Sequence, residues 1–229
     1  MLKHSPLSHF LLASILVVIT TMMIFYHLPK HETAQINTLI SPPISPIDTL
    51  AISPSSSFQQ PLHISDSKAL LLYTQGLGLY YQRQFPEALE LFDRALAIDP
   101  LCYEALNAKG ATLAFQGKYE QGLALIQQAL VLNPSFVYGN FNLGLANELA
   151  GRWDPAIAAY QKALQLDDRD TWSYYGIASI YGRLGNIDKV LEYLQPAIAL
   201  DPDVKEVARV EKDFAPVHTN PRFQALVKP

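Results

Sequence analysis

The sequence repeats one pattern every 34 residues, four times in succession and with no insertion between the copies. Alanine returns at this interval, glycine returns three times with alanine in the fourth copy, and a large apolar side chain returns between them. These positions are Ala95, Ala129, Ala163 and Ala197; Gly76, Gly110, Gly144 and Ala178; and Phe92, Ile126, Tyr160 and Leu194. Such a period predicts an all-α array of small units, each of which buries its apolar face only against its neighbours.

Each unit is expected to hold two helices joined by short turns. Gly117, Gly151 and Gly185 mark the ends of first helices, where glycine accepts a left-handed backbone, and Pro100 and Pro134 stop second helices. The first helices are predicted at 69–82, 103–116, 137–150 and 171–184. The second helices are predicted at 86–99, 120–133, 154–167 and 188–201. Such boundaries carry an error of about two residues.

The period and the residue types together resemble the tetratricopeptide repeat. The positions that carry the resemblance are Leu72, Gly76, Leu79, Ala88, Phe92, Ala95 and Pro100 in the first copy, and their equivalents 34, 68 and 102 residues later. The departures are mild, with Asn147 in place of an aromatic residue, Gly122 in place of an alanine and Asp168 in place of a proline. The repeats span 69–102, 103–136, 137–170 and 171–204.

The resemblance implies a right-handed α-α superhelix (solenoid) of four helical hairpins with a concave groove, and protein–protein binding as its function. The last hairpin of such an array needs a cap. Residues 205–229 are expected to supply it as capping helices, with Phe214, Phe223 and Leu226 as plugs over the last hairpin. The segment 204–213, which is rich in charge, is expected to form a solvated helix.

The N-terminal part of the chain has a different composition. Residues 10–26 are seventeen residues without a charge, and as a helix they span roughly 25 Å, just enough for a bilayer core. We therefore expect 1–28 to be a single-pass transmembrane anchor, and a cleaved signal sequence is the alternative. Lys3 favours an N-terminus in the cytoplasm, with the repeats on the non-cytoplasmic side. Residues 29–66, rich in proline and serine, are expected to be a disordered linker.

The composition excludes several classes of function. A net charge of −4 gives no basic surface for nucleic acid. The single cysteine cannot form an intramolecular disulfide, and the six histidines show no metal-ligand spacing. No phosphate-binding loop, nucleophile elbow or zinc-protease motif is present. We therefore expect a protein that is not an enzyme, with no catalytic residues, no metal and no cofactor.

In the family that the chain resembles, the first helix of each repeat lines the concave groove. Carrying these positions over gives a row of side chains that is mainly aromatic and nearly uncharged, of which we expect about half to be open to a ligand. The candidate groove residues are Tyr73, Leu77, Tyr80, Asn107, Phe115, Tyr138, Phe141, Asn142, Trp172 and Tyr175. Asn107 and Asn142 are candidates for hydrogen bonds to the backbone of an extended peptide.

Family members that hold the acidic C-termini of heat-shock chaperones carry a cationic carboxylate clamp in the groove. The equivalent positions here, which include Tyr73, Leu77, Ala108, Tyr138 and Asn142, supply no such clamp. The sequence therefore predicts a membrane-anchored scaffold that binds another protein or peptide, with assembly of a membrane complex as a natural use. The alternatives are an exported periplasmic binding module whose N-terminus is cleaved, and a regulatory subunit of an enzyme.

Overall fold

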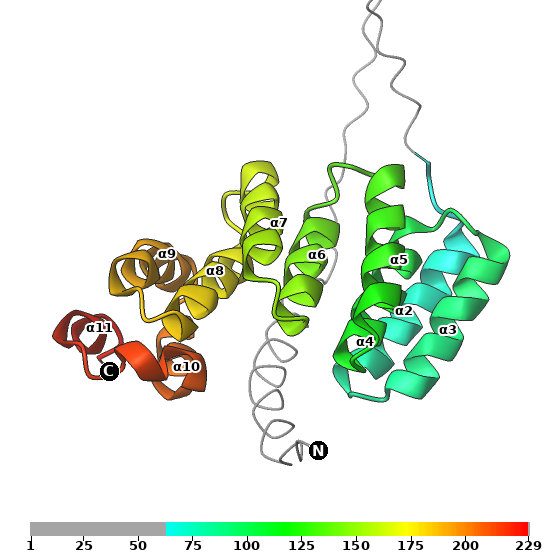
Figure 1. Ribbon diagram of the computed structural model, residues 1–229. Helices are drawn as coiled ribbons and strands as arrows, with labels where there is room; N and C mark the ends of the chain where they lie inside the picture. Colours follow the sequence, from blue (N-terminus) through cyan, green and yellow to red (C-terminus); the bar gives the residue numbers. More distant parts are fainter. Residues whose placement is uncertain (1–62, 229) are drawn as a thin grey trace, which may run out of the picture.

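The computed structural model describes residues 63–228, and all regular structure in that part of the chain is helical. Eight helices form four hairpins. The hairpins follow one another across the molecule (Figure 1). They are α2 (Ser67–Tyr81) with α3 (Phe85–Ile98), α4 (Tyr103–Phe115) with α5 (Tyr119–Leu132), α6 (Val137–Leu149) with α7 (Trp153–Leu166), and α8 (Thr171–Arg183) with α9 (Ile187–Leu200). The predicted helices are confirmed to within two residues at each end.

The turn inside each hairpin places one residue in the left-handed region. Gly117, Gly151 and Gly185 have φ values of 79°, 73° and 68°. The first repeat has Arg83 at the equivalent position, with a φ of 62°. Glycine adopts this conformation without the steric cost that a side chain adds, so three of the four hairpins turn without strain.

The turn between successive hairpins depends on a short polar side chain that recurs with the repeat but was not among the positions used to predict the turns. Asp99, Asn133, Asp167 and Asp201 stand 34 residues apart at the ends of the second helices. In each turn the side-chain oxygen accepts a hydrogen bond from the backbone N–H two residues later, at 2.9–3.2 Å. This local bond ends the helix and sets the direction of the next hairpin.

Small residues bring the two helices of a hairpin into direct contact. A Cβ atom added to Gly76 would lie 2.6 Å from the ring of Phe92, and one added to Gly144 would lie 2.5 Å from the ring of Tyr160. At Gly110 the obstacle is the carbonyl oxygen of Gly122, at 2.6 Å. Helix packing at this distance excludes even a methyl group, which explains why glycine recurs with the repeat.

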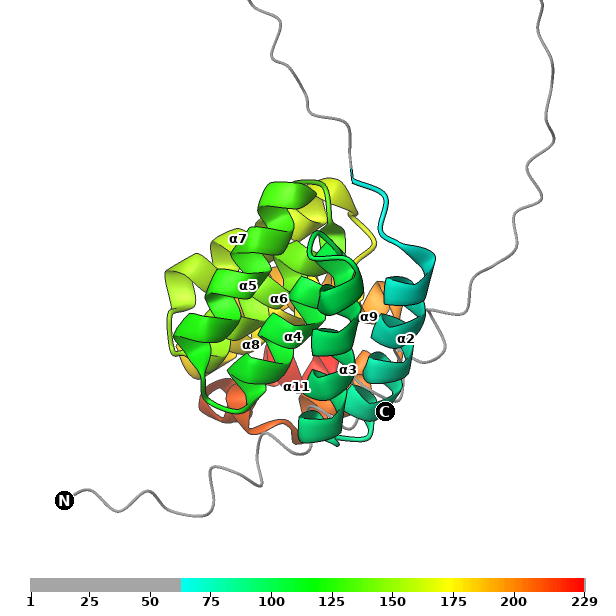
Figure 2. The same cartoon turned by 90° about the vertical axis from the view of Figure 1, so that its right-hand side faces the viewer.

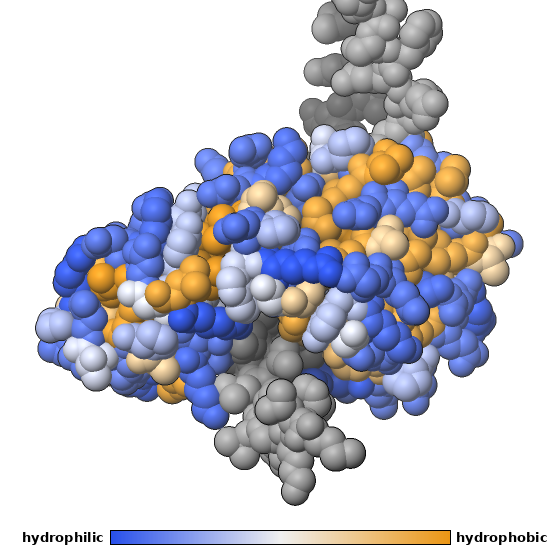
Figure 3. All heavy atoms as spheres, in the orientation of Figure 1, coloured by the Kyte–Doolittle hydropathy of each residue, from blue (hydrophilic) through white to orange (hydrophobic). Residues whose placement is uncertain are grey.

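The stacked hairpins form one continuous array. Seen from its N-terminal end the array has a rounded outline, because later hairpins lie behind earlier ones (Figure 2). On the face shown in Figure 3, hydrophilic side chains are widespread, and apolar side chains gather over the part of the array that contains α3 and α5. Ile98 of α3 and Val131 of α5 are among the exposed apolar residues.

Three short helices cap the last hairpin: α10 (Val204–Val210), the 3-10 helix η1 (Lys212–Val217) and α11 (Pro221–Leu226). Phe214 and Phe223 are fully buried and their rings stack 5.4 Å apart, as expected for plugs, whereas Leu226 is half-buried. The expectation of a solvated helix over 204–213 is wrong. The helix ends at Val210, and Val204, Val207 and Ala208 are buried against the array because they share one face of α10.

The chain enters the first hairpin through a segment that the sequence assigned to the linker. His63 hydrogen-bonds Asp99 through Nε2 at 2.9 Å, and the Ser65 hydroxyl donates to Glu104 at 2.6 Å. The backbone N–H of Asp66 also donates to Asp99, and the Asp66 side chain caps α2. Residues 63–66 therefore pack on the first repeat, because Asp99 and Glu104 supply acceptors that a proline- and serine-rich composition does not reveal.

The predicted transmembrane anchor at 10–26 and the rest of the predicted linker lie outside the described residues. Within 63–228, no helix combines the length and the apolar character needed to cross a membrane.

Candidate binding groove

The first helices of the repeats, α2, α4, α6 and α8, pack side by side, and each brings the same repeat positions to the inner face of the array. This face has two chemically different parts. The aromatic half is formed by Tyr73, Leu77, Tyr80, Phe115 and Tyr138 on α2, α4 and the start of α6. The charged half is formed by Glu148 at the end of α6, Tyr175, Ser179 and Arg183 on α8, and Asp213 in the cap.

The ten candidate groove residues differ in their exposure, and none is fully exposed. Four are half-buried and partly accessible: Tyr73, Leu77, Phe115 and Tyr138. Six are buried: Tyr80, Asn107, Phe141, Asn142, Trp172 and Tyr175. The repeat period identifies which side of a helix faces the groove, but it does not show how far a neighbouring ring covers that side.

Rings in the aromatic half pack against other rings of the same helix and of neighbouring helices. Phe115 of α4 stacks on Phe85 at 6.1 Å between ring centroids and lies 5.9 Å from Tyr80 of α2. Tyr138 of α6 stacks on Phe141 at 5.9 Å, and its hydroxyl lies 3.4 Å from that of Tyr81. These contacts hold the rings in place, so a partner would meet a preorganised apolar surface.

A narrow cavity opens between these helices. Its volume is about 10 Å³, which is close to the least that holds one water molecule. The cavity is lined by Leu77, Tyr80, Ala108, Ala111, Tyr138 and Asn142. A partner segment therefore has to lie over the half-buried rings, or the rings have to move apart to admit its side chains.

Asn107 does not have the geometry that the sequence suggested. It is fully buried in α4, and among residues 63–228 neither its amide nitrogen nor its amide oxygen has a hydrogen-bond partner. It cannot reach a peptide in the groove from this position. Asn142 is also buried, but it lines the cavity and stays a candidate for a polar contact with a bound segment.

The charged half is joined by a hydrogen-bonded network around Arg183. Its guanidinium donates to Glu148 at 2.9 Å and, through Nε and Nη2, to both carboxylate oxygens of Asp213 at 2.7 and 2.6 Å. Ser179 donates to Asp213 at 2.6 Å, and the Tyr160 hydroxyl donates to Glu148 at 2.6 Å. The two-bond contact with Asp213 is the strong geometry for an arginine and a carboxylate, and it ties the cap to α8.

Burial changes the ionisation of this network. It raises the pKa of Glu148, and the opposing effects of Arg183 and the Tyr160 hydroxyl do not cancel it. For Arg183, burial alone would lower the pKa, but Glu148 and Asp213 outweigh burial and keep the guanidinium charged. The guanidinium also lies 5.2 Å from the centroid of the Trp153 ring.

The prediction of a nearly uncharged groove is therefore wrong in the charged half. The repeat positions of the sequence place Glu148, Ser179 and Arg183 on the groove face together with Trp172 and Tyr175, but they do not predict the network, because Asp213 lies beyond the fourth repeat. The repeat period does indicate the position of Asp213. Asp213 stands 34 residues after Ser179, with which it bonds, so the cap continues the repeat spacing on the inner face.

Among the described residues, no three His, Cys, Asp or Glu side chains lie close enough to hold a metal ion. Cys102 is buried, and burial raises the pKa of its thiol to about 11, so it is not a reactive thiolate at neutral pH.

Comparison with known proteins identifies the repeats. Three models of the tetratricopeptide repeat match the sequence, at residues 69–102, 108–171 and 173–204. No curated protein matches it. Solved structures do match. A thermophilic tetratricopeptide repeat protein of Thermus thermophilus is 21% identical with a TM-score of 0.57, and the match covers 69% of this chain and 86% of that one.

Two structures of MamA are also similar. One is 20% identical with a TM-score of 0.53 over 69% of this chain and 85% of that one. The other is 21% identical with a TM-score of 0.51 over 60% and 81%. At these identities the similarity extends to the fold alone. The matching family models describe a repeat and name no enzyme activity.

Proposed function

This chain belongs to the tetratricopeptide repeat family, and we propose that it is a membrane-anchored scaffold that holds a segment of a partner protein in the aromatic half of its groove. The partner segment is apolar or aromatic. The protein has no catalytic role of its own, and it needs neither a metal nor a cofactor.

The observation that carries the proposal is the set of half-buried apolar side chains on three adjacent inner helices. Tyr73 and Leu77 on α2, Phe115 on α4 and Tyr138 on α6 are partly accessible and carry no charge. Aromatic side chains are enriched at binding hot spots, because each brings a large contact area at a small entropic cost. A partner that covers them gains apolar burial without first breaking an ion pair.

The anchor gives this binding a location. Residues 10–26 hold the repeats at a membrane surface, on its non-cytoplasmic side, and residues 29–62 separate the two parts. Confinement to the surface raises the effective concentration of the groove for partners in the same membrane. Assembly or stabilisation of a membrane complex is the use that fits this arrangement.

The groove is tested with two glutamate substitutions in the full-length protein. Leu77→Glu places a charge in the aromatic half, whereas Gln127→Glu places one on the exposed surface of α5. After affinity capture from native membranes, we expect Leu77→Glu to lose partners by about tenfold or more, as expected for a charge desolvated at a hot spot. Gln127→Glu should retain them. Equal capture by the two variants, with unchanged helicity, would contradict the proposal.

The anchor is tested by the intact mass of the mature protein and by extraction of membranes at alkaline pH. The proposal expects a mass that includes residues 1–28 and a protein that stays with the membrane pellet. A mass that lacks these residues, with release into the supernatant, would replace the anchored scaffold by an exported binding module.

A further inference from the structure

The first hairpin exposes a helix face that the later hairpins bury. On α2, Leu71, Thr74 and Gly78 lie on one stripe and are all exposed, Leu71 to 59%. The residues at the same positions of the later repeats are all buried. They are Ala105, Ala108 and Thr112 on α4, Gly139, Asn142 and Ala146 on α6, and Ser173, Gly176 and Ile180 on α8. Within residues 63–228, the stripe on α2 is therefore a stacking surface without a neighbour.

Two contacts in the later repeats show what covers these positions there. A Cβ atom added to Gly139, at the first position of the stripe, would lie 2.9 Å from the side chain of Leu130 on α5. One added to Gly176, at the second position, would lie 2.6 Å from the ring of Tyr160 on α7. Leu130 and Tyr160 each belong to the preceding hairpin. The stripe is thus the place where one hairpin receives another.

The sizes of the side chains on this stripe are reversed in the first repeat. Leu71 stands where the later repeats have alanine, glycine and serine, and Gly78 stands where they have threonine, alanine and isoleucine. A Cβ atom added to Gly78 would meet no atom within 4 Å among the described residues. The α2 helix therefore presents a protruding side chain and, seven residues later, a gap that could receive one.

Two copies of this face fit each other when their α2 helices run antiparallel. Seven residues are almost two helical turns, so Leu71 and Gly78 point the same way and lie about 10 Å apart along the helix axis. A two-fold axis that passes between Thr74 and Gln75 places Leu71 of each copy opposite Gly78 of the other. The same contact then forms twice in one interface, and glycine lets the two backbones approach closely.

The polar groups of α2 agree with this arrangement. The Thr74 hydroxyl donates to the backbone carbonyl of Leu70 at 2.8 Å, so it needs no new partner when it is covered. Gln75 lies beside the axis, and its amide has both donors and acceptors for the same group of the other copy. Lys68 is the one charged residue of α2. An antiparallel pair keeps the two copies of Lys68 at opposite ends of the interface, whereas a parallel pair would bring them together.

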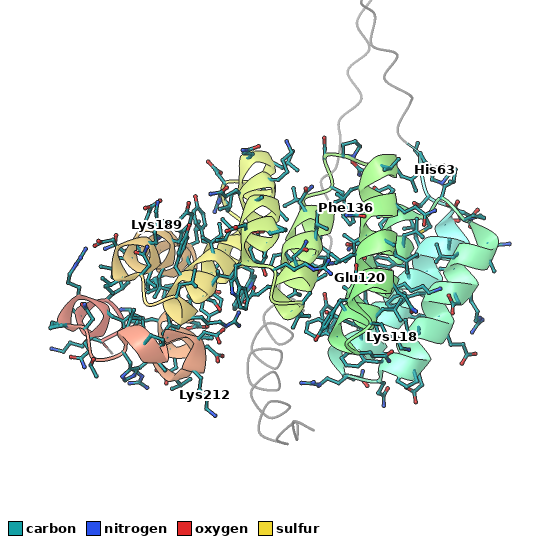
Figure 4. All side chains as sticks on the ribbon, viewed as in Figure 1. His63, Lys118, Glu120, Phe136, Lys189 and Lys212 are labelled. Atoms are coloured by element: carbon teal, nitrogen blue, oxygen red, sulfur yellow. The ribbon has the colours of Figure 1, made fainter. Side chains whose placement is uncertain are left out.

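The ends of the array favour a second copy of the chain as the occupant of this face. Copies cannot stack head to tail, because α10, η1 and α11 pack on the last hairpin and cover it. His63 lies beside the first hairpin, at the end of the array away from Lys212 in the cap (Figure 4). Residues 1–62 therefore join the array at the end that carries the exposed stripe. With residues 10–26 in the membrane, as proposed above, the copies are confined to one surface, which raises their effective concentration.

We propose that two copies of the chain pair through α2 across a two-fold axis, with Leu71 of each copy packed on Gly78 of the other. A single helix pair buries less than the roughly 1,200 Å² of a standard interface, so the pairing is weak in dilute solution and depends on confinement to the membrane. For that confinement it rests on the proposed anchor. It leaves the groove free, because Tyr73 and Leu77 lie on the opposite side of α2 from Leu71, and one pair therefore presents two grooves.

Disulfide formation in native membranes tests the register of the pair. Two full-length variants with tags of different size, Leu71→Cys and Gly78→Cys, are produced in the same cells and oxidised with copper phenanthroline. In the proposed pair, residue 71 of one copy contacts residue 78 of the other, whereas two copies of the same residue lie too far apart for a disulfide. We therefore expect the mixed dimer to exceed either homodimer by about tenfold.

Asp93→Cys is the matched control, because the same hairpin and the same N-terminal segment carry it. Asp93 is exposed and pairs with Lys109 of α4, so it faces the second repeat and not the stripe on α2. Together with Gly78→Cys it should give no mixed dimer above background. The natural Cys102 is common to all variants and is buried, so it does not compete for oxidation. Unchanged helicity of each purified variant verifies that the fold is intact.

The proposal is overturned if the mixed dimer of Leu71→Cys and Gly78→Cys is no more abundant than that of the control, or if the homodimers exceed it, as a parallel pair would produce. Thiols at both positions that resist a maleimide reagent without forming the dimer would also overturn it. That result would assign the face to another protein or to residues 1–62 of the same copy.

These outcomes are distinct from failure of the proposed function. Partner loss on Leu77→Glu tests the groove separately, and the intact mass tests the anchor. If the mature protein lacks residues 1–28 and the mixed dimer still forms in concentrated solution, the anchor is wrong and the pairing through α2 remains.

Discussion

The two halves of the groove use the same repeat positions for opposite purposes. In the aromatic half, Tyr73, Leu77 and Phe115 stay partly accessible, and the rings of Tyr73 and Phe115 contact other rings. In the charged half, Arg183 stands at the position of Phe115 two repeats later, and it joins Glu148 to Asp213. One backbone geometry therefore presents an apolar surface at one end and a closed ionic network at the other.

The difference teaches how the cap works. An apolar plug alone would cover the last hairpin, and Phe214 and Phe223 do this. The bonds from Ser179 and Arg183 to Asp213 add a directional constraint, because hydrogen bonds fix an orientation whereas apolar contacts do not. The C-terminal end of the array is therefore closed by the hydrogen bonds between α8 and the cap, whereas the accessible apolar surface lies at the other end.

The largest effect on stability is expected from removing the Arg183 side chain, which joins α6, α8 and the cap. Arg183→Met leaves the carboxylates of Glu148 and Asp213, whose side chains are only 10% and 13% exposed, without a cation, and we expect a loss of about 3 kcal/mol in the free energy of unfolding. Arg152→Met, which removes an exposed pair with Glu120, is the control and should cost less than about 1 kcal/mol. Chemical denaturation followed by circular dichroism measures both. Equal losses of stability in the two variants would mean that the network stabilises the fold no more than an exposed ion pair does.

The junction between the halves is the next most sensitive point. Gly144 lies against the ring of Tyr160, which donates to Glu148, so a methyl group there would push the ring away from the network. Gly144→Ala should cost about 2 kcal/mol through overpacking. Gly78→Ala has no atom within 4 Å of the new Cβ and lies inside α2, where alanine is the better helix former. It should stabilise by about 0.5–1 kcal/mol, and a loss in that variant would contradict this packing account.

A smaller effect is expected in the aromatic half. Phe115→Leu removes the stacked contact with Phe85 and the contact with Tyr80 while it keeps most of the apolar volume. We expect a loss of about 1.5 kcal/mol that is the same at pH 5 and pH 8 and is insensitive to salt, since no charge is involved. If that loss of stability depends markedly on pH, the aromatic half and the charged half are energetically coupled.

Among the substitutions of charged residues in the cap and the charged half, the smaller expected effect is a gain in stability, opposite in sign to the loss from Arg183→Met. Because burial raises the pKa of Glu211 in the folded protein, the ionised carboxylate lowers stability above that pKa. Glu211→Gln should therefore raise the free energy of unfolding by about 1 kcal/mol at pH 7. The gain should vanish as the pH falls below the unfolded value of about 4.3, where wild-type Glu211 is protonated in both states. A gain that persists at pH 3.5 would contradict this origin.

The fold follows closely from the sequence because each constraint appears four times. Gly144 and Gly110 indicate close helix contacts, and the helix ends agree to within two residues because breakers such as Gly117 and Pro100 recur with the period. The groove was harder to predict. The period identifies the face on which Trp172 and Tyr175 lie, but not that rings from α8 and the cap bury them.

The charged network illustrates the remaining limit. Its bonds between α6, α8 and the cap join residues 30–35 positions apart, and one partner, Asp213, lies beyond the last of the four repeats. Burial of Glu211 likewise depends on where α10 ends, and no local sequence pattern predicts that α10 ends at Val210. Such long-range polar contacts depend on packing that only the assembled array provides.

The most direct test of the central claim is site-specific photocrosslinking in native membranes. A photoreactive phenylalanine analogue replaces Leu77 in the aromatic half and, in a matched variant, Gln127 on the exposed surface of α5. The account predicts a crosslinked partner from position 77 and none from position 127. A partner that crosslinks from position 127 and not from position 77 would contradict it, and would move the binding surface to the outside of the array.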